Sequence, residues 1–208
     1  MNRLAILGAS GHGKVVADAA ECMGWRSIEF FDDAWPAITT IGKWTVLGGT
    51  LELLARIEEF DGVLVAIGNN DVRQEKLNVL KSLDARLPVL VHPSATVSRY
   101  ASIGAGSVVF ASAVVNAYAS VSDGAILNTG CSIDHDCILG SCVHISPGAR
   151  LAGAVSVGAG SWIGIGACVK QNVRIGSKVM VGAGAAVVGD ISDNMTVVGV
   201  PARAIVRG

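Results

Sequence analysis

The fold is decided by a six-residue period, which runs through residues 107–151, SVVFASAVVNAYASVSDGAILNTGCSIDHDCILGSCVHISPGARL. Every sixth residue from Val97 to Val187 is aliphatic, without exception over sixteen positions. The residue two places before each is always Ala, Ser, Cys or Val, and the residue one place after is Gly six times and Asn or Asp three times. Such an unbroken period is typical of a hexapeptide-repeat solenoid.

This pattern predicts a parallel β-helix with three flat faces and about 18 residues in each coil, which makes about five coils. The aliphatic residue points into the prism, and so does the residue two places before it, because side chains alternate along a strand. The second residue is small because the triangle is narrow, so Cys131 and Cys137 are expected to be packing residues. Gly, Asn and Asp one place after the aliphatic residue, including Asp134, are expected at corners with positive φ.

Residues 1–92 follow a different rule, in which apolar runs alternate with helical spacing. Strands are expected over residues 3–9, 27–33, 62–70 and 87–92, and helices over 14–24, 50–60 and 71–84. This alternation predicts a Rossmann-like parallel sheet with helices on its faces. Ligands bind at the carboxyl ends of such strands, where the turns 8–13, Asp32–Asp33 and 68–70 lie. We therefore expect an α/β domain at residues 1–92 and an all-β solenoid domain at residues 93–208.

The first turn, LGASGHGKVV at residues 7–16, nearly matches the phosphate loop G-x-x-x-x-G-K-[ST] of nucleoside triphosphatases. The magnesium-binding hydroxyl is missing, because Val15 follows Lys14. The order Gly8, Gly11, Gly13 also departs from the dinucleotide fingerprint G-x-G-x-x-G. Two interpretations remain: an anion-binding turn at a helix N-terminus, or a turn that only allows tight strand–helix packing.

The composition argues against several classes of protein. The formal net charge of -1 offers no electrostatic attraction to nucleic acid or to an anionic membrane. No apolar run reaches the roughly 18 residues of a membrane span, and the apolar start RLAILGA is too short for a signal peptide. Five cysteines without a C-x-x-C pair indicate neither a disulfide framework nor a zinc site. We expect a cytoplasmic protein with no metal and no nucleic-acid or membrane partner.

The hexads, together with VGVPAR at residues 198–203, resemble the hexapeptide-repeat acyltransferases. The resemblance implies a left-handed β-helix and a trimer that binds acetyl-CoA between neighbouring prisms. A narrower resemblance, to the sialic acid O-acetyltransferase family, is carried by GASGHGKVV, FDD, AIGNN, HPSA, NTG, IDHDC and HISPGA. Within that family the chain is most similar to bacterial N-acetyltransferases of UDP-4-amino-4,6-dideoxy sugars in the bacillosamine pathway.

The resemblance also implies which residues bind the two substrates. Asp32 and Asp33 would accept hydrogen bonds from the uracil or the ribose of a nucleotide sugar. The full set expected around that sugar is Ser10, Gly11, His12, Asp32, Asp33, Gly68 and Asn69. The set expected around acetyl-CoA is His144, Gly153, Ile165 and Ala183.

Acetyl transfer to an amine needs positioning and the removal of a proton, because the thioester is already activated. A neutral imidazole suits the proton acceptor, since its ordinary pKa is about 6.5. By resemblance, His135 is the general base and Asp136 is its carboxylate partner, where the family often has Glu. No Cys or Ser nucleophile is required, so we expect direct transfer without an acyl-enzyme.

His144 follows His135 by nine residues, which is half of an 18-residue coil. The two side chains should therefore point to different sides of one prism, and a site that uses both would draw them from adjacent subunits. His144 would then hydrogen-bond the thioester carbonyl or the pantetheine arm. His92 is expected to be structural, and Asn128 is either a corner residue or a substrate contact.

The expected function is acetyl-CoA-dependent N-acetylation of a UDP-linked 4-amino sugar by a homotrimer with active sites between subunits. O-acetylation of sialic acid and N-acetylation of a GDP-linked amino sugar such as perosamine are the enzymatic alternatives. A nucleotide-binding scaffold without catalysis is the alternative from another class. We also expect the N-terminal domain to cover one open end of the solenoid and the tail after Val187 to cover the other.

Overall fold

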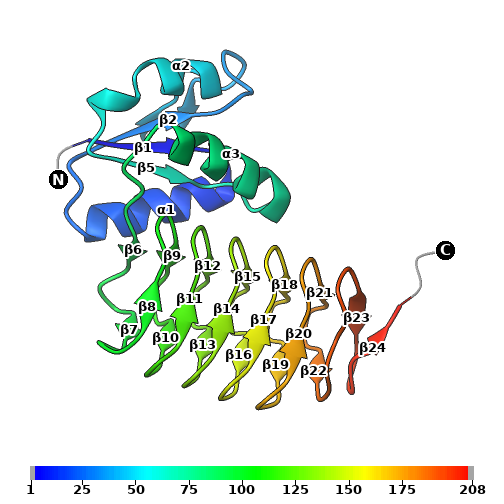
Figure 1. Cartoon of the computed structure of the whole chain (residues 1–208). Helices are drawn as coiled ribbons and strands as arrows, with labels where there is room; N and C mark the ends of the chain where they lie inside the picture. Colours follow the sequence, from blue (N-terminus) through cyan, green and yellow to red (C-terminus); the bar gives the residue numbers. More distant parts are fainter. Residues whose placement is uncertain (1–2, 206–208) are drawn as a thin grey trace.

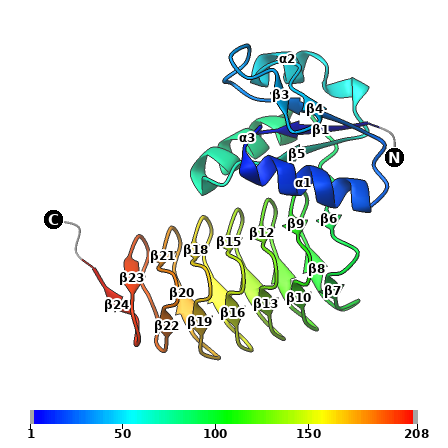
Figure 2. The ribbon, with the colours of Figure 1, turned by 180° about the vertical axis from the view of Figure 1, so that it is seen from behind.

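A computed structural model describes residues 3–205, which form an α/β layer and a long solenoid (Figures 1 and 2). The parallel sheet of the layer has the order β2-β1-β5, with β1 (Arg3–Leu7), β2 (Ser27–Phe31) and β5 (Gly62–Val65). Its other elements are α1 (Gly11–Cys22), the hairpin β3 (Thr40–Ile41) and β4 (Trp44–Thr45), α2 (Thr50–Ala55), the 3-10 turn Ile57–Glu59, and α3 (Asn70–Ser82). The predicted Rossmann-like layer is confirmed.

Alternate side chains of the sheet face two different cores. Leu4, Ile6 and Phe30 pack with α1 on one side of the sheet, whereas Leu7 and Phe31 pack with α2 and α3 on the other. This is the period of two that a strand imposes, and burial on both faces is typical of a parallel sheet covered by helices. The core on the α1 side continues into the solenoid, so the two parts of the chain share one apolar contact.

The strand expected over residues 87–92 belongs to a different sheet from the one predicted. Its two-residue strand, β6 (Leu90–Val91), pairs with β9 of the solenoid. Arg86 still lies beside β5, because the Val63 N–H donates to the Arg86 carbonyl at 2.8 Å, and the chain crosses to the solenoid between Arg86 and β6. The solenoid sheet therefore begins before residue 93, while the division into domains at residues 92 and 93 stays a prediction.

The solenoid repeats a two-residue strand at every hexad, and the second residue of each strand is the predicted aliphatic one. Face 1 consists of β7 (Thr96–Val97), β10 (Val114–Val115), β13 (Ser132–Ile133), β16 (Arg150–Leu151), β19 (Cys168–Val169) and β22 (Ala186–Val187). Face 2 consists of β8 (Ser102–Ile103), β11 (Ser120–Val121), β14 (Ile138–Leu139), β17 (Ser156–Val157) and β20 (Arg174–Ile175). Face 3 consists of β6, β9 (Val108–Val109), β12 (Ile126–Leu127), β15 (His144–Ile145), β18 (Trp162–Ile163), β21 (Met180–Val181), β23 (Thr196–Val198) and β24 (Arg203–Ala204). The predicted three-faced β-helix is confirmed.

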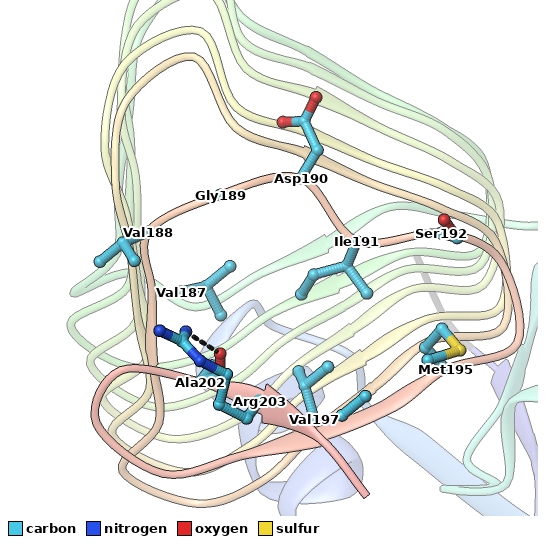
Figure 3. Close-up of a pocket in the computed structure, with 11 residues that line it drawn as sticks. Val187, Val188, Gly189, Asp190, Ile191, Ser192, Met195, Val197, Ala202 and Arg203 are labelled. Carbon is cyan, nitrogen blue, oxygen red and sulfur yellow. Dashed lines mark hydrogen bonds between the residues drawn. The ribbon is translucent and has the colours of Figure 1, made fainter. Parts of the chain in front are cut away.

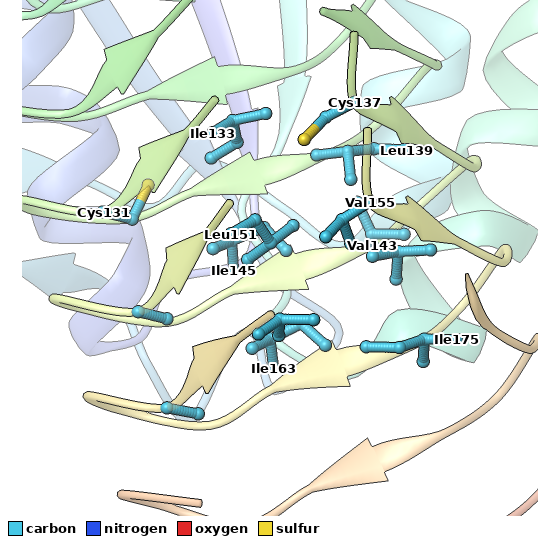
Figure 4. Close-up of a cluster of buried hydrophobic side chains, with 14 of the residues drawn as sticks. Cys131, Ile133, Cys137, Leu139, Val143, Ile145, Leu151, Val155, Ile163 and Ile175 are labelled. Atoms are coloured by element: carbon cyan, nitrogen blue, oxygen red, sulfur yellow. The ribbon is translucent and has the colours of Figure 1, made fainter. Parts of the chain in front are cut away.

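The interior of the prism is filled by the two inward positions of each hexad (Figure 4). Ile133 and Leu139 fill it at aliphatic positions, and Cys131 and Cys137 occupy the small ones. Burial raises the pKa of Cys131 to about 12 and also raises the pKa of Cys137. A thiol that stays protonated is a poor nucleophile, so both cysteines serve packing, as expected.

The glycines one place after the aliphatic residue have a different role from the predicted one. Positive φ falls three places after that residue, as at Asp136 (φ 58°) and Cys142 (φ 53°). Gly140, one place after, is instead a close contact between coils, because a Cβ there would lie 2.5 Å from the backbone N of Ala159. The expectation of positive φ at Asp134 is therefore wrong, and the glycines one place after the aliphatic residue are required by space rather than by φ.

The two ends of the solenoid are not covered in the way we expected. The N-terminal layer packs along face 3, where Val108 and Ile126 contact its core, and not over the first coil (Figures 1 and 2). At the other end, the tail after Val187 leaves a cavity of about 360 Å³ (Figure 3). Val187, Ile191 and Val197 point into this cavity. Val197, Ile191 and Ala202 also pack against the core of the solenoid, so the tail covers the last coil in part.

Candidate active site

A cavity of about 300 Å³ lies at the carboxyl ends of β1, β2 and β5, where the turns of the α/β layer meet. Gly8 lets the first turn approach β5, because its φ is 116° and a Cβ there would lie 2.7 Å from the Ala66 carbonyl oxygen. The lining includes four of the residues expected to bind substrate, Ser10, Asp32, Asp33 and Gly68. It also includes Leu7, Gly8, Ala66, Ile67, Val72 and Lys76. We call this cavity the strand-end pocket.

Both aspartates of the strand-end pocket are already hydrogen-bonded within the chain. Asp32 accepts from the Ala9 N–H at 2.7 Å, which ties the glycine turn to the end of β2. Asp33 accepts from the Thr50 N–H at 2.7 Å and from Lys76 Nζ at 2.9 Å. Burial acts to raise the pKa of Asp33, but the hydrogen bonds from Lys76 and Thr50 outweigh it and lower the pKa to about 2. The pocket therefore carries an ion pair at neutral pH.

The other three residues expected to bind substrate do not line the strand-end pocket. His12 turns toward the solenoid, where its ring meets Phe110 edge-on with 5.6 Å between ring centroids. Burial, and then the charge of Arg73, lower the pKa of His12 to about 4. Gly11 lines a neighbouring cavity of about 300 Å³. Asn69 caps α3 and lines a third cavity of about 240 Å³ against the solenoid.

His135 lies at the corner between faces 1 and 2, and its side chain is 60% exposed. Its Nδ1 is 2.8 Å from Oδ2 of Asp136, and this hydrogen bond raises the pKa of His135 above its ordinary value. Its backbone N–H donates to Oδ1 of Asp134 at 2.8 Å, and the same oxygen accepts from Asn116 Nδ2 at 2.9 Å. The ring lies against Gly153 of the next coil, where a Cβ would come within 2.5 Å of it. These contacts orient the imidazole on an open edge.

His144 points outward from face 3 and is only 7% exposed, so it lies on a different side of the prism from His135. Its ring packs on that of Trp162 with 4.2 Å between centroids, and its Nε2 is 3.2 Å from Asn128 Nδ2. Burial, and then the charges of Arg73 and His12, lower the pKa of His144 to about 3. The imidazole is therefore neutral at physiological pH. Within residues 3–205, neither its Nδ1 nor Nε2 of His12 has a further hydrogen-bond partner.

The other residues expected to bind acetyl-CoA fall on two corners. Ile165 and Ala183 are exposed one coil apart on the corner between faces 3 and 1, and the Gly184 N–H donates to the Ile165 carbonyl at 2.8 Å. Gly153 lies beneath His135 on the corner between faces 1 and 2. One chain does not bring these residues together, so their shared role stays a prediction that needs a second copy.

Metal-ligating side chains do not gather in the described range: no group of three or more His, Cys, Asp or Glu in residues 3–205 is placed to hold a metal ion. Nor does that range contain a helix that is long and apolar enough to cross a bilayer.

Several residues that line or support these sites are not among those predicted from the sequence. Lys76 lines the strand-end pocket from α3, and Trp162 lines the third cavity from face 3. Asn116 supports Asp134 from the preceding coil. A signal for Lys76 was available, because Val72 and Lys76 are four residues apart on one face of the helix that follows the third turn.

Comparison with known proteins shows which of them combine such an α/β layer with such a solenoid. Residues 3–80 match the PglD N-terminal domain family. The chain is 47% identical to the acetyltransferase domain of PglB from Neisseria gonorrhoeae FA1090, solved with acetyl coenzyme A, with a TM-score of 0.94 and 98% of each chain covered. It is 36% identical to PerB from Caulobacter crescentus, solved with CoA and GDP-perosamine, with a TM-score of 0.92 over 97% of this chain and 96% of that one.

Among curated proteins, the UDP-N-acetylbacillosamine N-acetyltransferase of Bacillus subtilis (strain 168) is 38% identical over 113 residues. That match covers 53% of this chain and 52% of the relative, so it spans about half the length of the curated protein. The solved structures extend the likeness to nearly the whole chain, both the α/β layer and the solenoid. The chain therefore belongs to the acetyl-CoA-dependent, hexapeptide-repeat N-acetyltransferases of amino sugars that begin with a PglD-type domain.

Proposed function

We propose that this chain transfers the acetyl group of acetyl-CoA to the 4-amino group of a UDP-linked 4-amino-4,6-dideoxy sugar, of the UDP-2-acetamido-4-amino-2,4,6-trideoxyhexose type. The observation that carries the proposal is the exposed imidazole of His135, oriented by Asp136, on a chain whose α/β layer has a pocket at its strand ends. The name of the curated relative supports a UDP-linked acceptor. The complex of PerB with GDP-perosamine favours a second candidate, a GDP-linked amino sugar.

His135 is proposed to act as the general base through Nε2. With Nδ1–H donated to Asp136, the neutral tautomer leaves the lone pair of Nε2 free. As the acceptor nitrogen attacks the thioester carbonyl and the C–S bond breaks, Nε2 takes the proton that the nitrogen loses. The imidazolium then returns this proton to the departing thiolate, so the products are the amide and free CoA. No covalent bond to the enzyme is needed.

The nucleotide of the acceptor is proposed to occupy the strand-end pocket. Asp33 and Lys76 offer an acceptor and a donor there, and Ser10 and Gly68 form its rim. We also keep Gly11, His12, Asp32 and Asn69 as contacts of the nucleotide sugar, and His144, Gly153, Ile165 and Ala183 as contacts of acetyl-CoA. A nucleoside of either kind suits a concave site with apolar walls and a few charged groups.

We infer that each active site combines two copies of the chain. His135 is at the corner between faces 1 and 2, whereas the strand-end pocket belongs to the layer that packs on face 3. Part of the pocket is carried by α3 at the corner between faces 2 and 3, so one whole face of the prism separates it from His135. We infer that the acceptor reaches His135 of a neighbouring copy rather than His135 of its own chain. A homotrimer in the cytoplasm, with each site between neighbouring prisms, is the proposed assembly.

The hydrogen bond between His135 and Asp136 predicts a defined change in pH dependence. The carboxylate stabilises the imidazolium and raises the pKa of His135, so the base becomes neutral only at a higher pH than a free histidine does. In Asp136→Asn, the acid limb of kcat/KM should therefore move to lower pH and the plateau should fall. Asn tolerates the left-handed backbone at this position (φ 58°), so the corner should persist. Initial rates across the acid limb measure the shift, and a limb that stays in place or moves to higher pH contradicts the role of Asp136.

The proposed function is tested by following thiol release from acetyl-CoA with three acceptors in parallel: a UDP-linked 4-amino-4,6-dideoxy sugar, GDP-perosamine and sialic acid. The proposal predicts the highest kcat/KM with the UDP-linked amino sugar. Faster transfer to GDP-perosamine identifies the second candidate, and faster transfer to sialic acid identifies O-acetylation. Thiol release with none of them refutes the enzymatic proposal in favour of a binding scaffold.

A further inference from the structure

Helix α3 lies along the corner between faces 2 and 3 and connects the strand-end pocket to the solenoid (Figures 1 and 2). Its polar contacts reach successive coils. Lys81 pairs with Asp123 near one end of the helix, and Asp71 pairs with Lys178 near the other. Between them, Asn70 Nδ2 donates to the Gly160 carbonyl at 2.9 Å.

Arg73 is the central residue of this contact, and it is 1% exposed. Its Nε donates to the Gly124 carbonyl at 2.8 Å, and its Nη2 donates to the Cys142 carbonyl at 2.8 Å. Gly124 and Cys142 occupy the same corner position in consecutive coils, 18 residues apart. One guanidinium therefore holds two coils of the solenoid.

The same guanidinium also holds the turn that forms one wall of the strand-end pocket. Its Nη1 donates to the carbonyls of Ile67 at 2.8 Å and of Gly68 at 3.1 Å. Both residues line the pocket. Nη2 donates in addition to Asn70 Oδ1 at 2.7 Å, so a second side chain fixes the plane of the guanidinium. Arg73 thus joins the pocket wall to the solenoid by direct hydrogen bonds.

The cost of burying this charge argues for a role beyond packing. No carboxylate in residues 3–205 forms a salt bridge with Arg73, and its partners are five carbonyl groups and one amide oxygen. Burial lowers the pKa of Arg73 to about 10, so it remains charged at neutral pH. A buried, unpaired charge is expensive, and an apolar side chain could fill the same space at lower cost. A planar fork of five N–H donors is, however, uniquely able to bind carbonyls in several directions at once.

We propose that Arg73 is a positioning residue for acetyl transfer: it sets the distance between the strand-end pocket and the solenoid, and thereby the place where the acceptor amine arrives. The inference rests on the proposed function. Because the chemistry occurs at an imidazole on the solenoid of a neighbouring copy, a small shift of the pocket displaces the amine from the thioester. A misplacement of about 1 Å can lower a rate by about a hundredfold.

The test compares Arg73→Lys with wild type and with Lys81→Met, using the whole chain. A lysine keeps the charge but cannot reach both the pocket turn and two coils. We expect kcat for the nucleotide-linked amino sugar to fall by about tenfold or more in Arg73→Lys. KM for acetyl-CoA should change by less than about threefold, because Arg73 forms no hydrogen bond with the residues proposed to bind acetyl-CoA. The dissociation constant for UDP alone, measured calorimetrically, should change less than kcat does. Lys81→Met, which removes a contact of the same helix with the same corner but does not touch the pocket, should keep the wild-type kcat.

A second acceptor distinguishes a loss of positioning of the acceptor amine from a general loss of enzyme activity. Transfer to the free amino sugar, which carries no nucleotide and does not use the strand-end pocket, should proceed equally slowly in wild type and in Arg73→Lys. An equal loss with both acceptors, or an unchanged kcat with the nucleotide-linked one, overturns the inference. Asn70→Ala removes the amide oxygen that accepts from Arg73 Nη2, which is a milder change than replacing Arg73. It should lower kcat in the same pattern but by a smaller factor. If the Arg73→Lys chain does not fold, Asn70→Ala takes its place in the test. If the wild-type chain is inactive on every nucleotide-linked sugar, the proposed function fails as well. Failure of the proposed function is thereby distinguished from failure of the inference about Arg73, in which the wild type is active.

Discussion

Replacing His135 with alanine is expected to lower the rate of acetyl transfer by about a hundredfold to ten-thousandfold, the usual contribution of a positioned general base. The ring is exposed, so its loss removes a proton acceptor without opening a cavity in the core. Gly153, against which the ring lies, is only uncovered by the change. Thiol release from acetyl-CoA measures the effect, and the melting temperature should stay near that of wild type.

His92→Ala is the matched control for His135→Ala. His92 accepts from the Ser94 N–H through Nδ1 at 3.1 Å at the start of the solenoid, and it is not among the residues proposed for the site. We expect this variant to keep most of the wild-type kcat. A His135→Ala chain that keeps more than about a tenth of the activity would show that proton removal by His135 contributes little.

Replacing Gly140 with alanine is expected to cost about 3 kcal/mol of folding stability, in the range of severe overpacking. The new Cβ would lie 2.5 Å from the backbone N and 2.9 Å from Cα of Ala159. Backbone of the next coil cannot move aside as a flexible side chain does, since its own hydrogen bonds fix the spacing of the coils. Denaturant unfolding, read as a change in midpoint at constant slope, measures the loss.

Gly130→Ala is the control that separates space from backbone conformation. Gly130 has φ of 64°, and a Cβ there meets no atom within 4 Å. Its only penalty is the left-handed backbone, which costs an L-residue about 1 to 2 kcal/mol. We therefore expect Gly140→Ala to be the more destabilising of the two. The reverse order contradicts the close-contact role assigned to the glycines one place after each aliphatic residue.

The solenoid was predictable because its rule is local and repeats. A residue such as Leu139 and a small one such as Cys137 report the inward direction directly, and the period sets the coil. The backbone conformation at the corners of the solenoid was not predictable in the same way. The period gives the spacing of the corners but not which corner residue has positive φ. Tyr118 and Lys178 adopt positive φ without being Gly, Asn or Asp, so composition hides the position.

In the candidate site, too, contacts between neighbours in the sequence could be predicted, whereas contacts that depend on packing could not. His135 and Asp136 are adjacent in sequence, so their hydrogen bond could be anticipated from resemblance and local chemistry. Asp33 could be placed at a strand end, and Lys76 on one face of the following helix, but their ion pair could not be predicted, because it depends on how α3 docks. The bonds from Arg73 to coils 51 and 69 residues away depend on the packing of two parts with different periods, which no local pattern encodes.

The central claim is that His135 of one copy acts on an acceptor held by another, and mixing two inactive chains tests it most directly. One chain is His135→Ala, and the other is Gly68→Trp, whose ring would fill the strand-end pocket and whose Cβ meets no atom within 4 Å. Co-refolded in equal amounts into a cyclic oligomer, the two should regain about a quarter of wild-type activity, because one site in about four then pairs an intact His135 with an intact pocket on its neighbour. Each variant alone stays inactive. A mixture as inactive as its parts, although the chains have co-assembled, contradicts the shared site.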